Sequence, residues 1–173
     1  TRALFGDVRW APVGPKVRAQ FAKALNAPKL HDEDWLNVLD CDSWALPREG
    51  FMGARPQIGR HSRPDPAKWP ADREGFLAAY PDDPQIDVHL MGYGAAQESI
   101  VGAAPKNWRI LPFGAMPPRD FLARLDYFVY HHHPHWVEAY GRSILEAMAS
   151  GVVPILAPHF RTLFGDAAVY CAP

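Results

Sequence analysis

The chain has 173 residues, of which 48% are hydrophobic and 21% charged, as in an ordinary soluble globular protein. Its 18 basic and 19 acidic side chains are interspersed and give a net charge of -1, which excludes the basic footprint of a nucleic-acid-binding protein. The two cysteines lie far apart, without the spacing of a zinc module or a disulfide scaffold, so a reducing compartment such as the cytoplasm is expected. No stretch reads as a signal peptide or a long apolar span, so we expect no insertion in a membrane.

Residues 1–50 read differently from the rest of the chain. The stretch "VRWAPVGPKVRAQFAKAL", residues 8–25, predicts a strand followed by an amphipathic helix, and the residues after it form no regular pattern. With so little sheet of its own, this part is expected to be the tail of a preceding domain and a linker. The sequence also starts without methionine and stops just after a predicted strand, so we expect a piece of a larger protein, truncated at its C-terminus.

Residues 51–173 alternate between short apolar runs and helical patterns. This alternation predicts an α/β fold with a doubly wound parallel sheet that helices cover on both faces. In such sheets ligands bind at the carboxyl ends of the strands, where the strand order reverses. The predicted strands are residues 56–61, 86–92, 107–114, 126–132, 152–158 and 167–172, and the predicted helices are residues 71–80, 117–125, 140–151 and 160–166. The sequence "GYGAAQ" has only the first two glycines of a dinucleotide fingerprint and favours a plain strand-to-helix turn.

Four histidines gather at the end of the fourth predicted strand, in "YHHHPHW". Successive side chains of a strand alternate between faces, so His131 and His133 would share one face, and His135 or Glu138 could complete a zinc site. However, catalytic zinc sites normally take their ligands from several elements, and no carboxylate in the run is clearly placed as a partner. We therefore favour a polar cleft, in which the imidazoles bind a ligand or the backbone, and expect no metal.

Two glutamates follow this run. Glu146 lies in the middle of a predicted helix that is apolar on nearly every side and is therefore buried. An unpaired buried carboxylate is costly, so Glu146 needs a partner, either Arg142 one turn earlier or the hydroxyl groups of a ligand. Glu138 lies eight residues before it, and in a continuous helix that spacing is about 12 Å. Because the paired carboxylates of glycosidases are roughly 5–9.5 Å apart, we expect the two glutamates to hold different parts of one extended ligand.

The residues between the glutamates suggest what that ligand is. The sequence "GRS", residues 141–143, opens the predicted helix. The backbone amides and the dipole at a helix N-terminus bind anions, and Gly141 places no bulky side chain in the way. The order of carboxylate, phosphate cradle and carboxylate matches a sugar attached to a nucleoside diphosphate.

The segment "VEAYGRSILEAMASGVVPIL" resembles the E-x7-E signature of retaining, nucleotide-sugar-dependent glycosyltransferases of the GT-B fold, and Glu138 and Glu146 fall on its two glutamates. The segment "IGRHSRPDPAKWP" is similar to the one that opens the second Rossmann-like domain of these enzymes, and "LMGYG" and "ILPFG" resemble their next two strand ends. The resemblance covers residues 58–173. It implies that residues 51–173 are the Rossmann-like, C-terminal donor-binding domain of a GT-B enzyme.

The resemblance also implies roles for individual residues. Glu138 and Glu146 would contact the donor sugar and the ribose, respectively, and Arg60 would neutralise the diphosphate, which makes Glu138 and Arg60 the expected catalytic residues. The other expected donor-binding residues are Glu146, Gly141, Arg142, Ser143, Lys68 and His133. The sequence departs from the family where Trp69 rather than glycine follows Lys68, and where histidines stand before the first glutamate in place of small or hydroxyl residues.

Enzymes of this family transfer a hexosyl group from a nucleoside-diphosphate-sugar to a glycan, lipid or small-molecule acceptor with retention of configuration, and generally need no bound metal or other cofactor. The acceptor binds mainly to a first domain that this chain is expected to lack, so the chain alone should bind nucleotide weakly and transfer no sugar. The resemblance implies cell-envelope polysaccharide biosynthesis in the cytoplasm, at the inner face of the membrane, with at most peripheral membrane contact and no nucleic acid as partner.

Two other functions use the same pocket. A GT-B nucleotide-sugar epimerase would bind the same donor and release free sugar isomers without glycosylating an acceptor. A non-catalytic binding module would bind the nucleotide-sugar without turnover. The residues named above leave both alternatives open.

Overall fold

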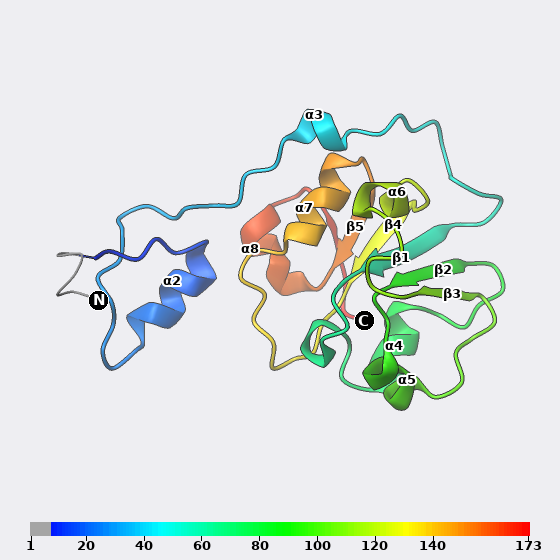
Figure 1. Cartoon of the computed structure of the whole chain (residues 1–173), viewed down its shortest axis with the longest axis horizontal. Helices are drawn as coiled ribbons and strands as arrows, with labels where there is room; N and C mark the ends of the chain where they lie inside the picture. The colour runs from blue at the N-terminus through cyan, green and yellow to red at the C-terminus, as the bar shows by residue number, and fades with distance from the viewer. Residues whose placement is uncertain (1–7) are drawn as a thin grey trace. The chain divides into compact units, whose positions relative to one another are not determined.

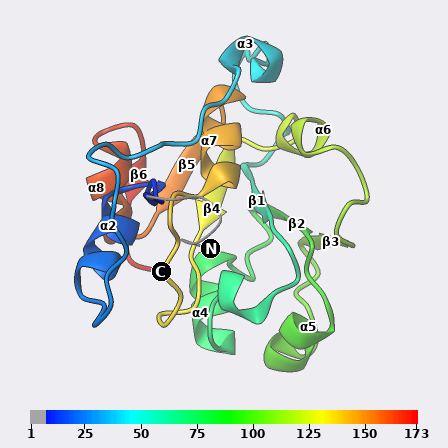
Figure 2. The same cartoon turned by 60° about the vertical axis from the view of Figure 1, so that its left-hand side comes forward.

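The computed structural model describes residues 8–173 and contains one parallel sheet of six strands in the order β3-β2-β1-β4-β5-β6. Each strand lies within a segment that the sequence predicts as a strand. The bounds are β1 Gln57–His61, β2 Asp87–Met91, β3 Trp108–Leu111, β4 Tyr127–Tyr130, β5 Val153–Leu156 and β6 Val169–Tyr170. Figure 2 shows β1, β2 and β3 side by side, with β4 on the other side of β1.

Helices cover both faces of this sheet, and Figure 1 shows α4 and α5 on one side with α6 and α7 on the other. Their bounds are α4 Arg73–Ala79, α5 Ala95–Val101, α6 Pro118–Leu122, α7 Arg142–Ala149 and α8 Arg161–Phe164, with short 3-10 turns η1 Pro66–Lys68 and η2 Pro158–Phe160. Local side-chain caps set the starts of α4 and α5. The Asp72 side chain caps α4 by accepting from Gly75 N, 2.8 Å away, and the Gln97 side chain accepts from Gly94 N at the start of α5. The predicted doubly wound α/β sheet is thus confirmed.

Each face of the sheet buries its own hydrophobic core, as expected for strands that are covered on both sides. The core on the α4 and α5 face includes Trp69, Phe76, Tyr80, Val88, Leu90 and Trp108. The core on the face of α6, α7 and α8 includes Phe121, Leu122, Phe128, Tyr130, Ile144 and Phe160. Successive residues of β4 alternate between the two cores, since Phe128 and Tyr130 belong to the second and Val129 to the first.

The described residues form two compact units. The smaller contains the described residues up to Val38 together with Glu138–Arg142, and the larger contains Leu39–Val137 and Ser143–Pro173. Within the larger unit, the segment before β1 carries the four-residue helix α3 (Cys41–Trp44), and Arg48 anchors this segment to the loops around α6 and α7. The Arg48 guanidinium donates to the backbone oxygens of Ser150, Leu125 and Leu122, at 2.7, 2.7 and 2.9 Å. The assignment of residues 1–50 to a preceding domain and linker stays a prediction.

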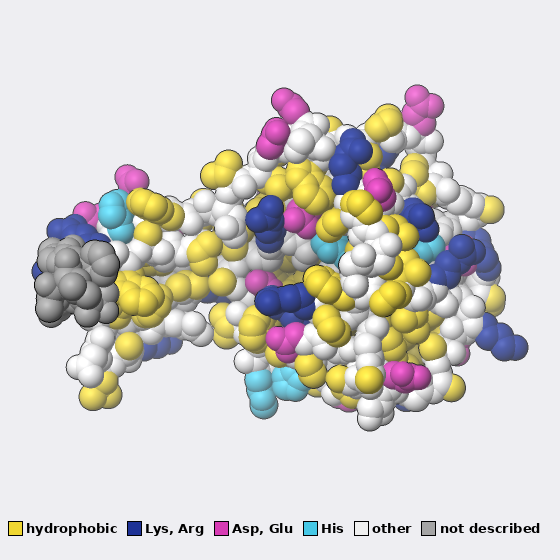
Figure 3. Space-filling model, in the orientation of Figure 1, with side chains coloured by type: hydrophobic (Ala, Val, Ile, Leu, Met, Phe, Trp, Pro, Cys, Tyr) yellow, Lys and Arg dark blue, Asp and Glu magenta, His cyan; other side chains and the backbone are white. Residues whose placement is uncertain are grey.

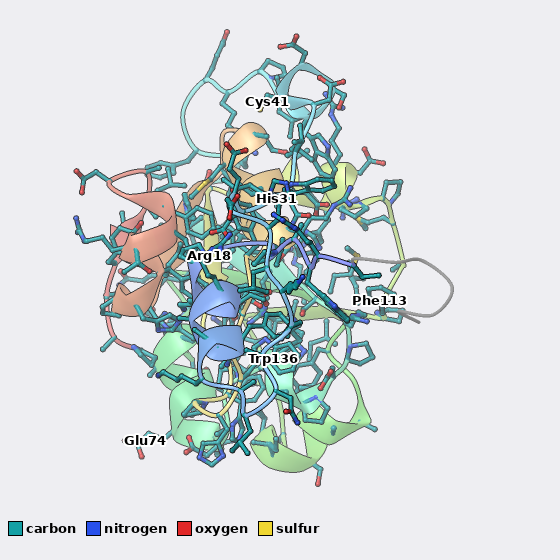
Figure 4. All side chains as sticks on the ribbon, turned by 90° about the vertical axis from the view of Figure 1, so that its left-hand side faces the viewer. Arg18, His31, Cys41, Glu74, Phe113 and Trp136 are labelled. Atoms are coloured by element: carbon teal, nitrogen blue, oxygen red, sulfur yellow. The ribbon has the colours of Figure 1, made fainter. Side chains whose placement is uncertain are left out.

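The smaller unit contains the predicted helix as α2 (Pro15–Ala22). The strand predicted before it is reduced to one isolated parallel bridge between Trp10 and Leu30. Arg18 of α2 binds the segment that follows Leu30. Its guanidinium donates to Asp34 Oδ1 at 2.7 Å and to the backbone oxygen of His31 at 2.9 Å (Figure 4). A single bridge forms here because the prolines that flank Trp10 and Leu30 in the sequence remove backbone donors that a longer ladder needs.

The surface carries charges of both signs, mixed with apolar side chains, on the face that Figure 3 shows. No helix among residues 8–173 is both long enough and apolar enough to cross a membrane.

Candidate functional site

The strand order reverses between β1 and β4, because β2 and β3 lie on one side of this pair and β5 and β6 on the other. In doubly wound sheets, the carboxyl ends of the strands at such a switch point form the ligand crevice. Here those ends carry Arg60 and His61 of β1, and His131 directly after β4. The helix α7, which carries Glu146, is the first regular element after β4 and packs on the sheet through Ile144 and Ala147.

Arg60 is fully buried at this switch point, with 0% of its surface exposed. Its guanidinium carbon lies 4.1 Å from the centre of the Tyr130 ring and 4.6 Å from that of Trp69, and its Nη1 donates to the backbone oxygen of His131 at 2.8 Å. Its Nε and Nη2 make no hydrogen bond with the residues that the structure describes. A ligand therefore reaches Arg60 directly only if one of the residues that cover it moves.

His61 points to the opposite face of β1, toward α7. Its ring packs against Phe121 and Phe128, with centroids 6.0 and 5.6 Å away, and its Nε2 lies 3.6 Å from Glu146 Oε2. Burial, together with the positive charge of Arg60, lowers the pKa of His61 to about 4. The imidazole is therefore neutral at pH 7, so the contact between His61 and Glu146 is not an ion pair despite its geometry.

Glu146 is buried in α7, with 8% of its surface exposed, as the apolar surroundings predict. Its carboxylate lies beside His61 at the carboxyl end of β1. This is the face of the strand opposite to the one that Arg60 occupies. Arg142, the alternative partner that the sequence suggests for Glu146, is exposed and belongs to the smaller unit, whereas Ser143 belongs to the larger one.

The loop after β4 brings two further predicted residues together. The backbone amide of His133 donates to the Ala67 oxygen at 3.3 Å, which places this loop beside η1 and Lys68. The Lys68 Nζ lies 4.6 Å from the centre of the Trp136 ring, in a cation–π contact. His131 is buried, and burial together with Arg60 and two neighbouring histidines lowers its pKa to about 4. Among residues 8–173, no three His, Cys, Asp or Glu side chains gather as a metal-binding group.

Glu138, Gly141 and Arg142 belong to the smaller unit. Glu138 is buried, with 8% of its surface exposed. Burial lowers the pKa of Lys16, and the negative charge of Glu138 opposes that shift, so the two side chains influence each other electrostatically. Gly141 has a φ of +79°, a left-handed conformation that favours glycine, directly before α7 begins at Arg142.

A hollow of about 630 Å³ lies at the other edge of the sheet, at the amino ends of β2 and β3. Arg55, Asp87, Asn107 and Arg109 are among the residues that line it. Arg55 is already paired there with Asp87, at 2.7 Å. Ligands of doubly wound sheets bind at the carboxyl ends of the strands. This hollow lies at the amino ends, so we do not take it as the ligand site despite its size.

Sequence reasoning missed several residues around the predicted ones. The position of His61 could have been predicted, because it follows Arg60 in a buried strand and its side chain must therefore point to the opposite face of the sheet. Trp69 and Tyr130 enclose Arg60, and Trp136 contacts Lys68. These partners are distant in sequence or lie across a loop, so only the folded structure reveals the contacts.

No model of a known protein family matches the sequence, and no curated protein matches it either. Among solved structures, the chain is similar to HepE (Alr3699) of Anabaena in complex with UDP and glucose, with 20% identity and a TM-score of 0.57, over 83% of this chain and 41% of that one. A second HepE structure, in complex with UDP-glucose, is similar with 17% identity and a TM-score of 0.57, over 83% of this chain and 42% of that one. The chain thus spans about two fifths of the length of the HepE chains. At these identities the likeness shows the fold, a Rossmann-like α/β domain.

Proposed function

We propose that the chain is the nucleotide-sugar donor-binding part of a glycosyltransferase that transfers a hexosyl group from a nucleoside-diphosphate-sugar to an acceptor with retention of configuration. The observation that carries the proposal is that two buried side chains of opposite charge type meet the end of β1 at the switch point. Arg60 lies on one face of the strand, and Glu146 of α7 reaches the other face beside His61. The HepE structures of the same fold hold UDP with glucose, or UDP-glucose, which supports the same ligand class here.

In this proposal each group of side chains binds one part of the donor. Glu146 accepts hydrogen bonds from the ribose hydroxyl groups, and Glu138 contacts the donor sugar. Arg60 and Lys68 supply positive charge to the diphosphate. Gly141, Arg142 and Ser143 offer it backbone amides at the start of α7, where the helix dipole favours an anion. His133 adds a polar group from the loop after β4.

The reaction needs one bond to break and one to form on the same face of the sugar. The bond between the anomeric carbon and the diphosphate oxygen breaks, and its electron pair leaves with the diphosphate. The acceptor oxygen bonds to the anomeric carbon, and its proton passes to the departing phosphate. The main contribution of the protein is electrostatic, because Arg60, Lys68 and the amides of α7 stabilise the charge that develops on the leaving group. We propose that no metal or other cofactor takes part.

The wider assignments follow from the same proposal. The acceptor is a sugar, glycan or lipid-linked molecule that binds a domain outside this chain, and the enzyme works in the cytoplasm at the inner face of the membrane in envelope polysaccharide synthesis. The chain alone should therefore bind nucleotide weakly and transfer no sugar.

Two variants test the assigned roles of the glutamates. Glu146→Gln should weaken the binding of UDP by about 1.5–3 kcal/mol, the usual worth of a charge-assisted hydrogen bond. Glu138→Gln should leave the UDP affinity nearly unchanged, because that residue is assigned to the sugar, and should lower the turnover of an intact enzyme that contains it. Titration calorimetry with UDP measures the first effect and a transfer assay the second.

The same pair of variants separates the ligand role of Glu146 from a structural one. If Glu146 only pairs with Arg142, Glu146→Gln should lower the unfolding temperature while the folded protein keeps its affinity for UDP. Equal loss of UDP binding in both variants, or in neither, would show that the roles are wrongly assigned.

A further inference from the structure

His61 is a buried polar residue for which the proposed reaction has no use. It has 8% of its surface exposed, and Phe121 and Phe128 hold its ring edge-on. Its Nε2 is buried and makes no hydrogen bond with the described residues, although it lies 3.6 Å from Glu146 Oε2. Buried polar atoms normally have a partner, and the Glu146 carboxylate is the group at which this nitrogen points.

The 3.6 Å separation is slightly longer than the roughly 2.7–3.2 Å of an N–H···O hydrogen bond. A shift of less than about 1 Å in the Glu146 side chain would therefore complete the bond. A carboxylate only accepts hydrogen bonds, so the bond requires the imidazole tautomer that carries its proton on Nε2.

The protonation state of His61 decides what such a bond would do. With its pKa lowered to about 4, the imidazole is a neutral donor at pH 7. A neutral donor fixes the direction of a carboxylate without cancelling its charge, and one hydrogen bond uses only one of the several acceptor positions that a carboxylate has. A cation in the same place would compete with the ligand for that charge.

We propose that His61 is a positioning residue that donates Nε2–H to Glu146 Oε2 when a nucleotide is bound, and so holds the carboxylate in the orientation that the ribose hydroxyl groups require. This inference rests on the proposed function, in which Glu146 binds the ribose. His61 itself touches no part of the donor, and its effect is confined to interactions that Glu146 makes.

The experiment compares two ligands that differ only in the groups that Glu146 is assigned to bind, namely UDP and 2′,3′-dideoxy-UDP, which lacks both ribose hydroxyl groups. Calorimetry is carried out on the full chain and on three variants. His61→Leu removes the donor and keeps the bulk, His61→Gln retains an amide donor near the position of Nε2, and Glu146→Gln removes the charge of the acceptor. His61→Met serves as a second donor-free side chain should the leucine variant fail to fold.

His61→Leu should weaken UDP binding by about three- to tenfold, as expected for one hydrogen bond, and should leave the affinity for dideoxy-UDP unchanged. His61→Gln should recover most of the lost UDP affinity. A ring that only fills space between Phe121 and Phe128 would affect both ligands equally, and that result, or no effect on either ligand, overturns the inference.

The outcomes separate this inference from the proposed function. If Glu146→Gln weakens UDP binding and spares dideoxy-UDP while His61→Leu changes neither, only the role of His61 is wrong. If the unchanged chain binds neither UDP nor GDP nor ADP, the proposed function is wrong, and the inference is overturned with it.

Discussion

Arg60→Met is expected to weaken the binding of UDP by about 2–4 kcal/mol, or roughly 30- to 1,000-fold, while the chain remains folded. Arg60 is buried at the switch point, where the diphosphate is proposed to bind. If its charge and one phosphate charge are about 5–6 Å apart, they attract each other by about 3 kcal/mol at the effective dielectric constant of a protein site. Its replacement by an apolar side chain of similar length should change the free energy of unfolding by less than about 2 kcal/mol. The lost contacts with Trp69 and Tyr130 are offset because a buried charge no longer has to be desolvated.

Arg55→Met provides the matched control. It removes the same charge from the same chain, but at the amino ends of the strands, where Arg55 pairs with Asp87. It should leave UDP affinity unchanged. Calorimetry with UDP and thermal unfolding of both variants decide the point. If Arg60→Met unfolded the chain, or if it bound UDP as tightly as the Arg55→Met protein, Arg60 would be a structural residue rather than part of the donor site.

Gly92→Ala is expected to lower the free energy of unfolding of the larger unit by about 4 kcal/mol or more, which is exceptionally large for a single substitution. Gly92 follows β2 with a φ of +90°, and a Cβ atom there would lie 1.7 Å from the backbone oxygen of Ser62. The two segments are joined to the sheet by their backbone amides, since Ser62 N donates to Met91 O at 3.0 Å and Gly92 N donates to Leu111 O at 2.9 Å. Neither segment can move away without breaking these hydrogen bonds at the carboxyl ends of the strands, where the candidate site lies.

Gly50→Ala separates the effect of the contact from that of the backbone conformation. Gly50 has a similar φ of +86°, but a Cβ atom there would meet nothing within 4 Å. Its replacement should cost only the strain of a left-handed alanine, about 1–2 kcal/mol. Chemical denaturation of both variants gives the two free energies. Equal destabilisation would mean that the approach of Gly92 to Ser62 does not constrain this edge of the sheet.

The sheet could be predicted from the sequence because each strand of a two-sided parallel sheet is a short apolar run bounded by turn residues. The segment "IGRH" shows both the success and its limit. Its place in β1 and its burial follow from the apolar pattern, and the family resemblance assigns Arg60 to the donor. The enclosure of Arg60 by Trp69 and Tyr130 could not be predicted from the sequence. Trp69 directly follows η1 and Tyr130 ends β4, so the two rings meet around Arg60 only when the sheet has formed.

The smaller unit was less predictable for a physical reason. The pattern around Trp10 is that of a strand, but a strand forms only where a neighbour offers a ladder, and here the ladder is limited to one bridge with Leu30. The buried state of Glu146 could be predicted from the apolar residues around it in α7. That His61 would face it could not, since the contact depends on how α7 lies across β1.

Binding of a nucleoside diphosphate at the switch point can be observed residue by residue in an NMR titration of the full, ¹⁵N-labelled chain with UDP. The amide signals that shift are expected to cluster at Arg60 and His61, at His133, and at the start of α7. Signals that shift instead around the hollow lined by Arg55 and Asn107, or an absence of shifts at millimolar UDP, GDP and ADP, would contradict binding at the switch point.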